Sequence, residues 1–561
     1  MFDVCIENLL EDTKQIATWA RISGTKDELD SFGYIKNRLD EIGAATVLHS
    51  HDAYVSIPMN ASLQVAGQFF ECRTHSMSAV VDNLQARIVF GGKIATLTED
   101  ICKGNIVIVD GRAEREPVIK AYALGAVGVV CAAGEYIYES CLSPVWGSPS
   151  YKNKHLLPAI PVVSITVASC AEIKAMIQND STVQAVLSTE VESGWHKQPL
   201  LVAEIKAPVA TEQFVMFSAH VDSWFYGAMD NGSANAVLLE VARVASKNID
   251  LLKYNLRLVF FSGHSQGRYS GSSWYFDNNW EDLHYNCILS VNIDSPGAIG
   301  ANDLTRSTIM PEAKPLAKRI IKEIADVEFV GRRYSRFADQ SFWGTGVSCA
   351  FASFSKQLLA GQTTVGNFAI PVGGSLDLGW WWHTPADTFD KIDPDNLKRD
   401  ASIFANYIMY YLCNRVVDLD FRMAIAEIRE GLLAWQEKAG DQFDLQVAIE
   451  RAERISLAME LFYANKPTED STMECITTYN QALWAMGRQL VRVNYTCGNH
   501  YQNDPAVPQP PIPALMDINR LVQATSKQER LEVFVELQRS LNYVLHSLTE
   551  VLNVLKKGES K

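Results

Sequence analysis

The stretch from Phe214 to Asp222, FVMFSAHVD, decides the fold. Its first six residues are apolar or small, which is the composition of a β-strand buried on both faces. Three later apolar runs are separated from it and from one another by amphipathic segments: Leu256–Phe261, Ile288–Ile293 and Ser348–Ser353. This alternation predicts an α/β domain with a mostly parallel sheet covered by helices.

Polar side chains stand directly after these strands. His220 and Asp222 follow the first strand, and Asp230 opens the turn before the next helix. Further along come His264-Ser265, Asp294 and, after three tryptophans, His383. Because ligands of open α/β sheets bind beyond the carboxyl ends of the strands, we expect these groups to meet at one edge. Histidine nitrogens and carboxylate oxygens are zinc ligands, so the pattern predicts a metal site.

The rest of the chain has other patterns of predicted secondary structure. Thr25 and Glu28 form a capping box, and apolar residues at helical spacing run on to Gly43, so a helix is predicted there. From about residue 54 to 187 short strands and turns predict a self-contained β-rich module. After Asn414 the pattern is helical, including a long stretch from Gln528 to Leu555, and it predicts a helical bundle.

Composition narrows the class of function. The chain has 561 residues, with 65 acidic and 50 basic side chains, and a net charge of −15. This acidic balance disfavours nucleic acid and anionic membranes as partners and leaves a small molecule or peptide. No leader segment and no long apolar window is evident, so we expect the mature protein to be the whole chain. The 11 cysteines include no C-x-x-C pair, which favours a reducing cytoplasm over a disulfide framework.

Several motifs in order resemble one family. Residues 218–222 (SAHVD), 227–234 (GAMDNGSA) and 383–388 (HTPADT) are similar to the co-catalytic zinc aminopeptidase family, which includes leucyl aminopeptidase, glutamate carboxypeptidase and transferrin receptor. Residues 20–25 (ARISGT) resemble its opening helix region, and 338–343 (ADQSFW) resemble its Ser-Asp-x-x-Phe element.

The resemblance implies a domain plan. Residues 1–53 are the N-terminal helical part of the peptidase-like domain, and 54–190 are an inserted protease-associated domain. Residues 191–415 are the metallopeptidase-like domain, and 416–561 are a helical domain like the family's dimerisation domain. A homodimer is implied by this resemblance alone.

The resemblance also assigns metal ligands. Asp230 bridges two metal ions, His220 and Asp294 complete one site, and His383 belongs to the other. The departure lies at the second strand, where the family has Glu-Glu as general base and ligand, and this chain has His264-Ser265. With two carboxylates lost, the expected cofactor is one or two zinc ions, or another divalent metal.

The residues themselves leave the role of His264 open. It is a general base or acid, a metal ligand, or neither, since imidazole both titrates near neutral pH and ligates zinc. Ser265 is either a poor ligand or a turn residue. Asp222 is either a carboxylate that fixes the ring of His220 or an exposed turn residue. The candidate catalytic residues are therefore His264 and Asp222.

Aromatic residues and one arginine bear on the substrate. Trp224-Phe225-Tyr226 and Trp380-Trp381-Trp382 either line an aromatic pocket or pack in the core. Arg268 either clamps a substrate carboxylate or forms a surface salt bridge.

Three functions remain at this level. The leading hypothesis is a metal-dependent, aminopeptidase-like hydrolase that cleaves an amide bond in a small peptide or amino-acid conjugate, with His264 in place of the usual glutamate base. The second is a non-peptidase hydrolase or lyase that uses the same metal. The third is a non-catalytic scaffold like that of transferrin receptor.

Overall fold

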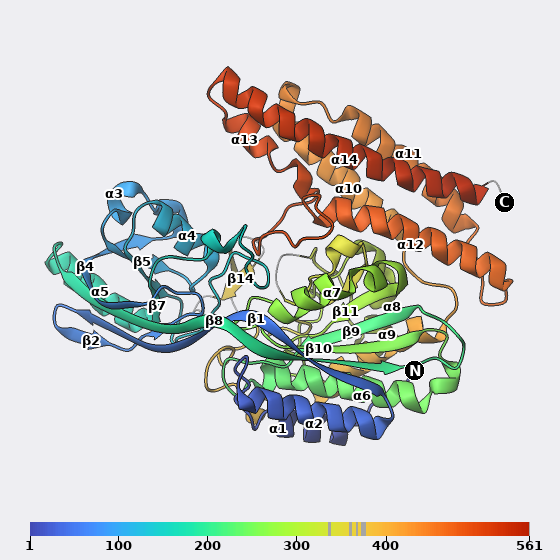
Figure 1. Cartoon of the computed structure of the whole chain (residues 1–561), viewed down its shortest axis with the longest axis horizontal. Helices are drawn as coiled ribbons and strands as arrows, with labels where there is room; N and C mark the ends of the chain where they lie inside the picture. Colours follow the sequence, from blue (N-terminus) through green and yellow to red (C-terminus); the bar gives the residue numbers. More distant parts are fainter. Residues whose placement is uncertain (335–337, 358–361, 366–367, 372–376, 560–561) are drawn as a thin grey trace.

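The computed structural model describes residues 1–334, 338–357, 362–365, 368–371 and 377–559. Its chain forms a large mixed sheet, helices on both faces of part of that sheet, and a helical C-terminal region (Figure 1). The α/β fold class predicted from the sequence is confirmed.

The strands that carry the predicted site residues lie side by side. The central order is β12-β11-β9-β10-β8, in which β9, β10, β11 and β12 are parallel and β8 is antiparallel to β10. Three of the four strands predicted from apolar runs are found nearly in full, whereas the fourth is reduced to two residues. The bounds are β9 (Phe214–His220), β10 (Asn255–Phe261), β11 (Cys287–Asn292), β12 (Cys349–Ala350) and β8 (Gln184–Ile205).

Alternate residues of β9 enter two different cores. Val215 and Phe217 face a core shared with α6 and α9, where Phe217 stacks on Phe404 at 5.6 Å between ring centroids. Phe214 and Met216 face the other core, which contains Tyr275 and other residues of α7. Both faces of the strand are thus dry, as its continuous apolar run predicted. The helices around this sheet are α1 (Ile6–Ile16), α2 (Lys26–Ile42), α6 (Ala234–Lys247), α7 (Ser270–Asn286), α8 (Lys314–Ala325) and α9 (Pro394–Cys413).

Helix α2 begins and ends where its caps predicted. The Thr25 side chain accepts a hydrogen bond from the Glu28 amide, and Gly43 adopts the left-handed conformation, with φ of 87°, that ends the helix. The Glu28 carboxylate accepts from the amide of Gly24, one residue before the expected capping-box partner. This helix packs on α6, which is the partner surface that its apolar stripe requires.

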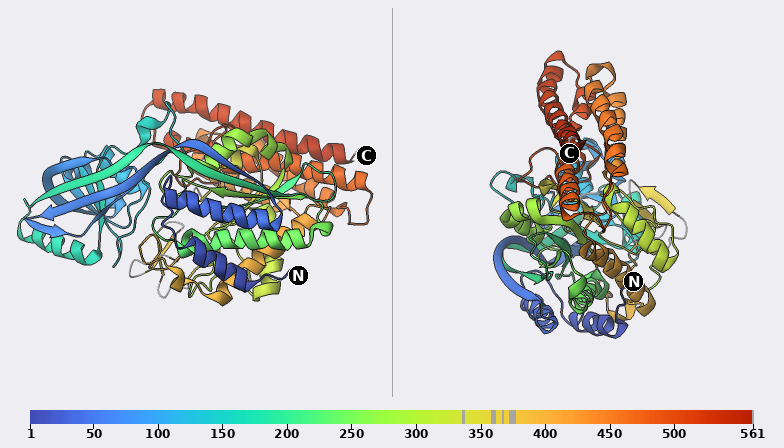
Figure 2. Two further views of the ribbon diagram at one scale, coloured as in Figure 1. Left: turned by 60° about the horizontal axis from the view of Figure 1, so that its bottom comes forward. Right: turned by 90° about the vertical axis from the view of Figure 1, so that its right-hand side faces the viewer.

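The β-rich segment is continuous with the central sheet. β1 (Ala45–Val65) and β8 pair antiparallel over almost their whole lengths, and β4 then continues the sheet from β8 (Figure 2). The boundaries predicted at 53/54 and 190/191 fall inside β1 and β8, so this module shares two strands with the domain that bears it. Its other elements are β2 (Gln68–Phe70), β3 (Arg73–Thr74), β4 (Val81–Gly92), α3 (Glu99–Cys102), β5 (Ile106–Asp110), α4 (Arg115–Ala123), β6 (Gly128–Ala132), β7 (Val162–Ile165) and α5 (Val167–Asn179).

The C-terminal region is helical, as the sequence pattern predicted. It lies on the side of the central sheet opposite α1 and α2 (Figure 1). A two-stranded hairpin, β13 (Gln362–Val365) and β14 (Phe368–Pro371), stands apart from the large sheet. Within the described residues no helix is long and apolar enough to cross a membrane. The helices are α10 (Phe421–Ala439), α11 (Gln446–Ala464), α12 (Met473–Tyr495), α13 (Ile518–Gln523) and α14 (Lys527–Glu559).

Candidate metal centre

The predicted ligands meet at the carboxyl ends of the parallel strands. His220 is the last residue of β9, Asp294 follows β11, and Asp230 lies in the turn before α6. His220 Nε2 lies 3.3 Å from Asp230 Oδ1 and 3.8 Å from Asp294 Oδ1. On the other side of Asp230, Oδ2 lies 3.2 Å from His383 Nε2. The structure therefore brings together all four residues predicted as ligands, with Asp230 between the two histidines.

These groups fit a divalent metal. Ligand atoms at 2.0–2.2 Å from a tetrahedral zinc are separated from each other by about 3.3–3.6 Å. The separations around His220 Nε2 are close to this range. His220 Nε2 and Asp230 Oδ1 are also buried without a hydrogen-bond partner among the described residues, and a buried polar atom left in that state is costly. A metal ion between them would satisfy both.

The ring nitrogens that face away from this centre are fixed. His220 Nδ1 lies 2.9 Å from the carbonyl oxygen of Asp222, and His383 Nδ1 lies 2.7 Å from that of Glu139. A carbonyl oxygen only accepts hydrogen bonds, so each Nδ1 carries the proton. Each Nε2 lone pair is then available to a metal, as in zinc sites with fixed histidine tautomers.

The charges around Asp230 favour a cation. Burial alone would lower the pKa of His220, but the nearby carboxylates of Asp230 and Asp294 outweigh it and hold the pKa well above its usual value. Burial alone would raise the pKa of Asp230, but His220 and His383 hold it far below its usual range. Asp230 is therefore ionised, and either a proton or a metal ion is stabilised at His220 Nε2.

His264 lies beside the metal centre, but its ring is not oriented to share an ion with His220. One ligand atom each of His220, His264 and Asp294 lie within 4.8 Å of one another. However, the rings of His220 and His264 are stacked 3.7 Å apart at an interplanar angle of 12°. A metal ion bound by histidine lies about 2.0–2.1 Å from the nitrogen and in the plane of the ring. Two nearly parallel rings at this spacing have no common position of this kind. The two rings cannot bind one ion in this arrangement.

Asp339 holds His264 from behind. His264 Nδ1 lies 2.7 Å from Asp339 Oδ2, and Asp339 Oδ1 accepts a hydrogen bond from the Ser272 hydroxyl at 2.8 Å. Burial opposes ionisation of Asp339, but the charge of His264 prevails and lowers the pKa of this carboxyl. With Nδ1 bound to Asp339, Nε2 is the remaining ring nitrogen of His264. Asp339 lies in residues 338–343, which were noted only for their resemblance to a family motif. Nothing in the sequence pattern predicted its contact with His264.

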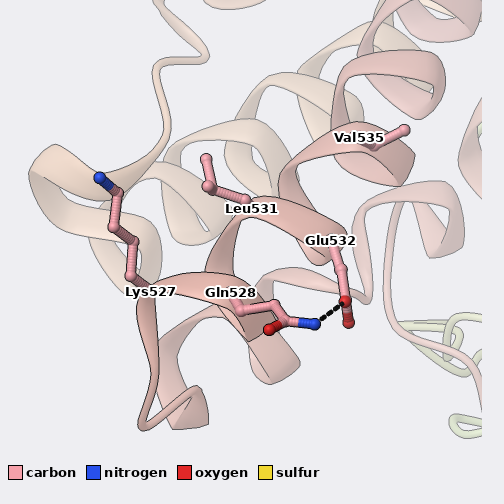
Figure 3. Close-up of a pocket in the computed structure, with 5 residues that line it drawn as sticks. All are labelled: Lys527, Gln528, Leu531, Glu532 and Val535. Atoms are coloured by element: carbon pink, nitrogen blue, oxygen red, sulfur yellow. Dashed lines mark hydrogen bonds between the residues drawn. The ribbon is translucent and has the colours of Figure 1, made fainter.

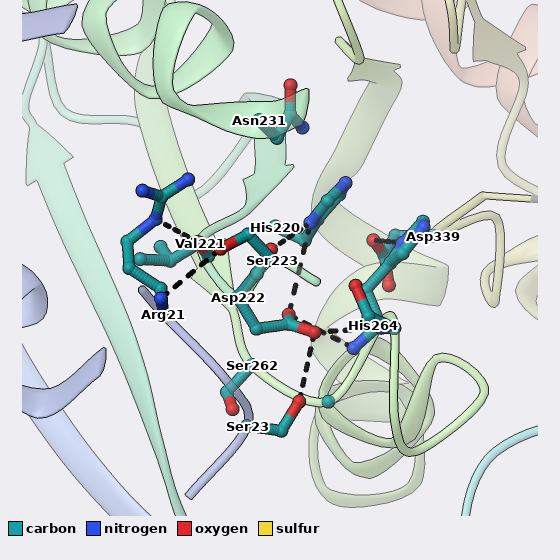
Figure 4. Close-up of polar contacts among 12 residues, drawn as sticks. Arg21, Ser23, His220, Val221, Asp222, Ser223, Asn231, Ser262, His264 and Asp339 are labelled. Carbon is teal, nitrogen blue, oxygen red and sulfur yellow. Dashed lines mark hydrogen bonds and ion pairs between the residues drawn. The ribbon is translucent and has the colours of Figure 1, made fainter. Parts of the chain in front are cut away.

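Asp222 contacts the site differently from either expectation. It is fully buried, so it is no exposed turn residue. Its carbonyl oxygen lies 2.9 Å from His220 Nδ1, whereas its carboxylate Oδ1 lies 3.9 Å from the same nitrogen. The carboxylate accepts from the backbone amides of His264 at 3.1 Å and Ser265 at 2.8 Å, and from the Ser23 hydroxyl at 3.0 Å (Figure 4). Asp222 thus fixes the turn that carries His264, because its carboxylate binds the backbone of that turn. Ser265 takes part through that backbone amide.

Two buried charges that sequence reasoning missed support Asp230 and its loop. The carboxylate of Asp387 accepts from the amides of Met229 at 2.9 Å and Asp230 at 3.0 Å. Burial raises the pKa of Asp387 to about 7. The fully buried guanidinium of Arg21 donates to the carbonyls of Val221 at 2.7 Å and Gly227 at 2.9 Å. Both residues lie in the family-like motifs, which was the available signal.

The aromatic residues divide between the two roles considered. Trp381 is buried in the main core. Trp382 stacks on His383 at 3.3 Å, and Trp224 lies 5.3 Å from the same ring, so these two flank a metal ligand. Arg268 is only 8% exposed, and its Nε has no partner in the described part of the chain. It is therefore no surface salt bridge.

Known proteins resemble this chain in sequence. A sequence profile of Peptidase family M28 matches residues 201–408. Carboxypeptidase Q of Xenopus laevis is 28% identical over 269 residues, which are 44% of this chain and 54% of that protein. A probable glutamate carboxypeptidase VP8 of Zea mays is 28% identical over 131 residues, which are 23% of this chain and 18% of that protein. The chain thus spans about half of the first relative and less of the second.

Solved structures share the fold. An aminopeptidase from Aneurinibacillus sp. strain AM-1 superposes with a TM-score of 0.55 at 21% identity, covering 73% of this chain and 94% of that one. A zinc aminopeptidase from Bacillus subtilis gives 0.56 at 18% identity, covering 75% and 98%. The resemblance inferred from motifs is confirmed: residues 201–408 of this chain match the sequence profile of Peptidase family M28.

Proposed function

We propose that this protein is a metal-dependent hydrolase that cleaves an amide bond in a small peptide or amino-acid conjugate, with His264 as its proton-transfer group. The observation that carries the proposal is the Asp339–His264 pair, which lies beside the proposed metal ligands. Membership of the M28 domain in a peptidase family supports the reaction class. The geometry around His264 supports the departure from the family's glutamate.

One metal ion is the simplest content for this site. His220, Asp230 and Asp294 offer three ligands on one side and leave a fourth position open, as catalytic zinc requires. On the other side Asp230 and His383 remain, and Ser265 stands where the family has a carboxylate. A divalent ion bound by the first set supplies Lewis acidity toward the amide carbonyl and makes water more acidic.

The protein's own residues then move the proton. With Nδ1–H held by Asp339, His264 Nε2 accepts a proton from the attacking water as the new C–O bond forms. The ionised Asp339 stabilises the resulting imidazolium. His264 then returns the proton to the amide nitrogen as the C–N bond breaks, which yields a carboxylic acid and an amine.

A cluster of arginines supports a substrate with a free carboxylate. Arg268 follows the turn of His264, and its neighbour Tyr269 packs edge-on against the His264 ring at 4.9 Å. Arg268 Nε and Arg115 Nε are both buried without a partner in the described structure. Burial and the charge of Arg268 lower the pKa of Arg115, whereas the charge of Glu114 opposes this shift. An anionic substrate group would satisfy both.

The C-terminal helices support a homodimer. Near the start of α14 a shallow cavity of about 530 Å³ is lined by Lys527, Gln528, Leu531, Glu532 and Val535 (Figure 3). Leu531 is 58% exposed and Val535 is 51% exposed. Exposed apolar side chains that lie close together are typical of protein interfaces. A second copy of this chain is the proposed occupant.

Metal content tests the site first. Protein purified without chelator should contain about one equivalent of zinc per chain by elemental analysis, and Asp230→Ala should lose it because one of three ligands is removed. His546→Gln, which alters an exposed histidine on α14, is the matched control and should retain the metal. Two equivalents would contradict the single-ion proposal. Failure to take up added zinc, manganese or cobalt would instead indicate a non-catalytic scaffold.

The proton-transfer role predicts two graded losses. His264→Ala should lower kcat by about 10²- to 10⁴-fold, the usual contribution of a general acid–base group, while zinc content stays unchanged. Asp339→Asn should lower kcat by about 10- to 100-fold, because the ring loses its carboxylate partner. Steady-state kinetics with amino-acid amides, dipeptides and N-acyl amino acids measures both. Full turnover in His264→Ala would refute the role.

The arginine cluster predicts substrate discrimination. Arg268→Met should raise KM about 10- to 100-fold for a substrate with a free carboxylate, since a charge-assisted hydrogen bond contributes roughly 1.5–3 kcal/mol. The matched control is the same substrate with its carboxylate converted to an amide, whose KM should not change. Equal effects on both substrates would mean that Arg268 has only a structural role.

The dimer is tested by sedimentation velocity over a range of concentrations. Wild-type protein should sediment as a dimer, and Leu531→Glu with Val535→Glu should shift it to monomer, because two charges would be buried in the interface. Leu251→Glu changes an exposed leucine outside the C-terminal helices and should leave the dimer intact. A monomeric wild-type protein at all concentrations would refute the proposal.

A further inference from the structure

The β-rich insert supplies one main-chain group to the metal centre. The carbonyl oxygen of Glu139 accepts a hydrogen bond from His383 Nδ1 at 2.7 Å. In return, the Glu139 amide donates to the carbonyl oxygen of His383 at 3.4 Å. Residue 139 belongs to the segment between β6 and β7, whereas His383 follows the tryptophans of the peptidase domain. The orientation of this histidine is therefore set by a different part of the fold.

Glu139 is itself held in place by the insert. Its carboxylate is 3.1 Å from Arg73 Nη1, and the residue is only 8% exposed. Arg73 lies on β3, which pairs with β7. Directly after Glu139 the chain is tied to Ser76, whose amide donates to Ser140 at 3.1 Å and whose carbonyl accepts from Leu142 at 3.0 Å. The carbonyl of Glu139 thus has a fixed position relative to the insert's strands.

Aromatic contacts connect the insert to the loop that carries His383. Tyr136 stacks on Trp380 at 4.4 Å between ring centroids. The guanidinium of Arg112 lies 4.9 Å from the ring of Trp382, which in turn stacks on His383. The insert therefore contacts residues 380, 382 and 383 of the loop, and its position relative to the peptidase domain determines where this loop sits.

We propose that Arg73 and Glu139 are positioning residues for the metal centre: through the Glu139 carbonyl, the insert fixes the ring of His383 and thereby the second oxygen of Asp230. The insert is then a structural part of the centre and not only a spacer or wall. This inference rests on the proposed metal site, but it concerns the protein's own ring orientation, which can be measured without metal or substrate.

The experiment compares variants of the ion pair. Arg73→Met removes the pair and Glu139→Ala removes its acidic partner, whereas Arg73→Lys and Glu139→Gln keep a donor and an acceptor. Lys174→Met, which breaks the 3.5 Å pair with Asp110 elsewhere in the insert, is the control. Zinc affinity is measured by competition with a chelator. In metal-free, ¹⁵N-histidine-labelled protein, the Nδ1 proton of His383 is identified by its absence in His383→Gln.

Arg73→Met and Glu139→Ala should bind zinc about 10- to 100-fold more weakly, the usual cost of losing an orienting partner of a ligand. The Nδ1 proton of His383 should exchange faster in both, while the Lys, Gln and control variants should behave as wild type. Tyr136→Ala removes the stacking contact with Trp380 at a ring that is 37% exposed. It replaces Arg73→Met if that variant does not fold, and it should show the same changes. Unchanged zinc affinity and unchanged proton exchange in the folded variants would overturn the inference. If wild-type protein binds no zinc, the exchange measurement alone decides it.

Discussion

The contact on which the site depends is the pairing of Asp230 with two histidines, His220 on one carboxylate oxygen and His383 on the other. His220 comes from the end of β9, whereas His383 comes from a loop far along the chain. A buried, ionised carboxylate needs partners that stabilise its charge, and here both partners are imidazoles whose outer nitrogens are bound to backbone carbonyls. Asp387 and Arg21 then hold the loop of Asp230 from the other side.

His264 and Ser265 stand where the motif resemblance would place two glutamates, and the turn that carries them is well held. Asp222 still binds the backbone of the turn, so the turn keeps its position while its side chains differ. His264 has a carboxylate partner in Asp339, and the Asp339–His264 pair has two features of a proton-transfer group, an oriented imidazole ring and partial burial. One dication instead of two would also match the lower number of carboxylates.

Sequence patterns predicted the parts of the site that are set by local structure. Apolar runs identify strands, so His220 and Asp294 could be placed at strand ends, and the parallel order of those strands then brought them together. The contact of His264 with Asp339 and that of His383 with Glu139 depend on irregular loops, whose paths follow from no period. The length of β1 and β8 was also missed, because their exposed faces carry charged and polar residues, and the apolar pattern does not extend along the whole strand.

The two long strands β1 and β8 have a mechanical consequence. Because they run without a break from the central sheet into the β-rich segment, the two parts are joined by a hydrogen-bonded ribbon and not by a flexible linker. Rotation of one part against the other must bend or twist this ribbon, and large rotation must break its ladder. Opening of the space near His383 is therefore restricted to small elastic displacements.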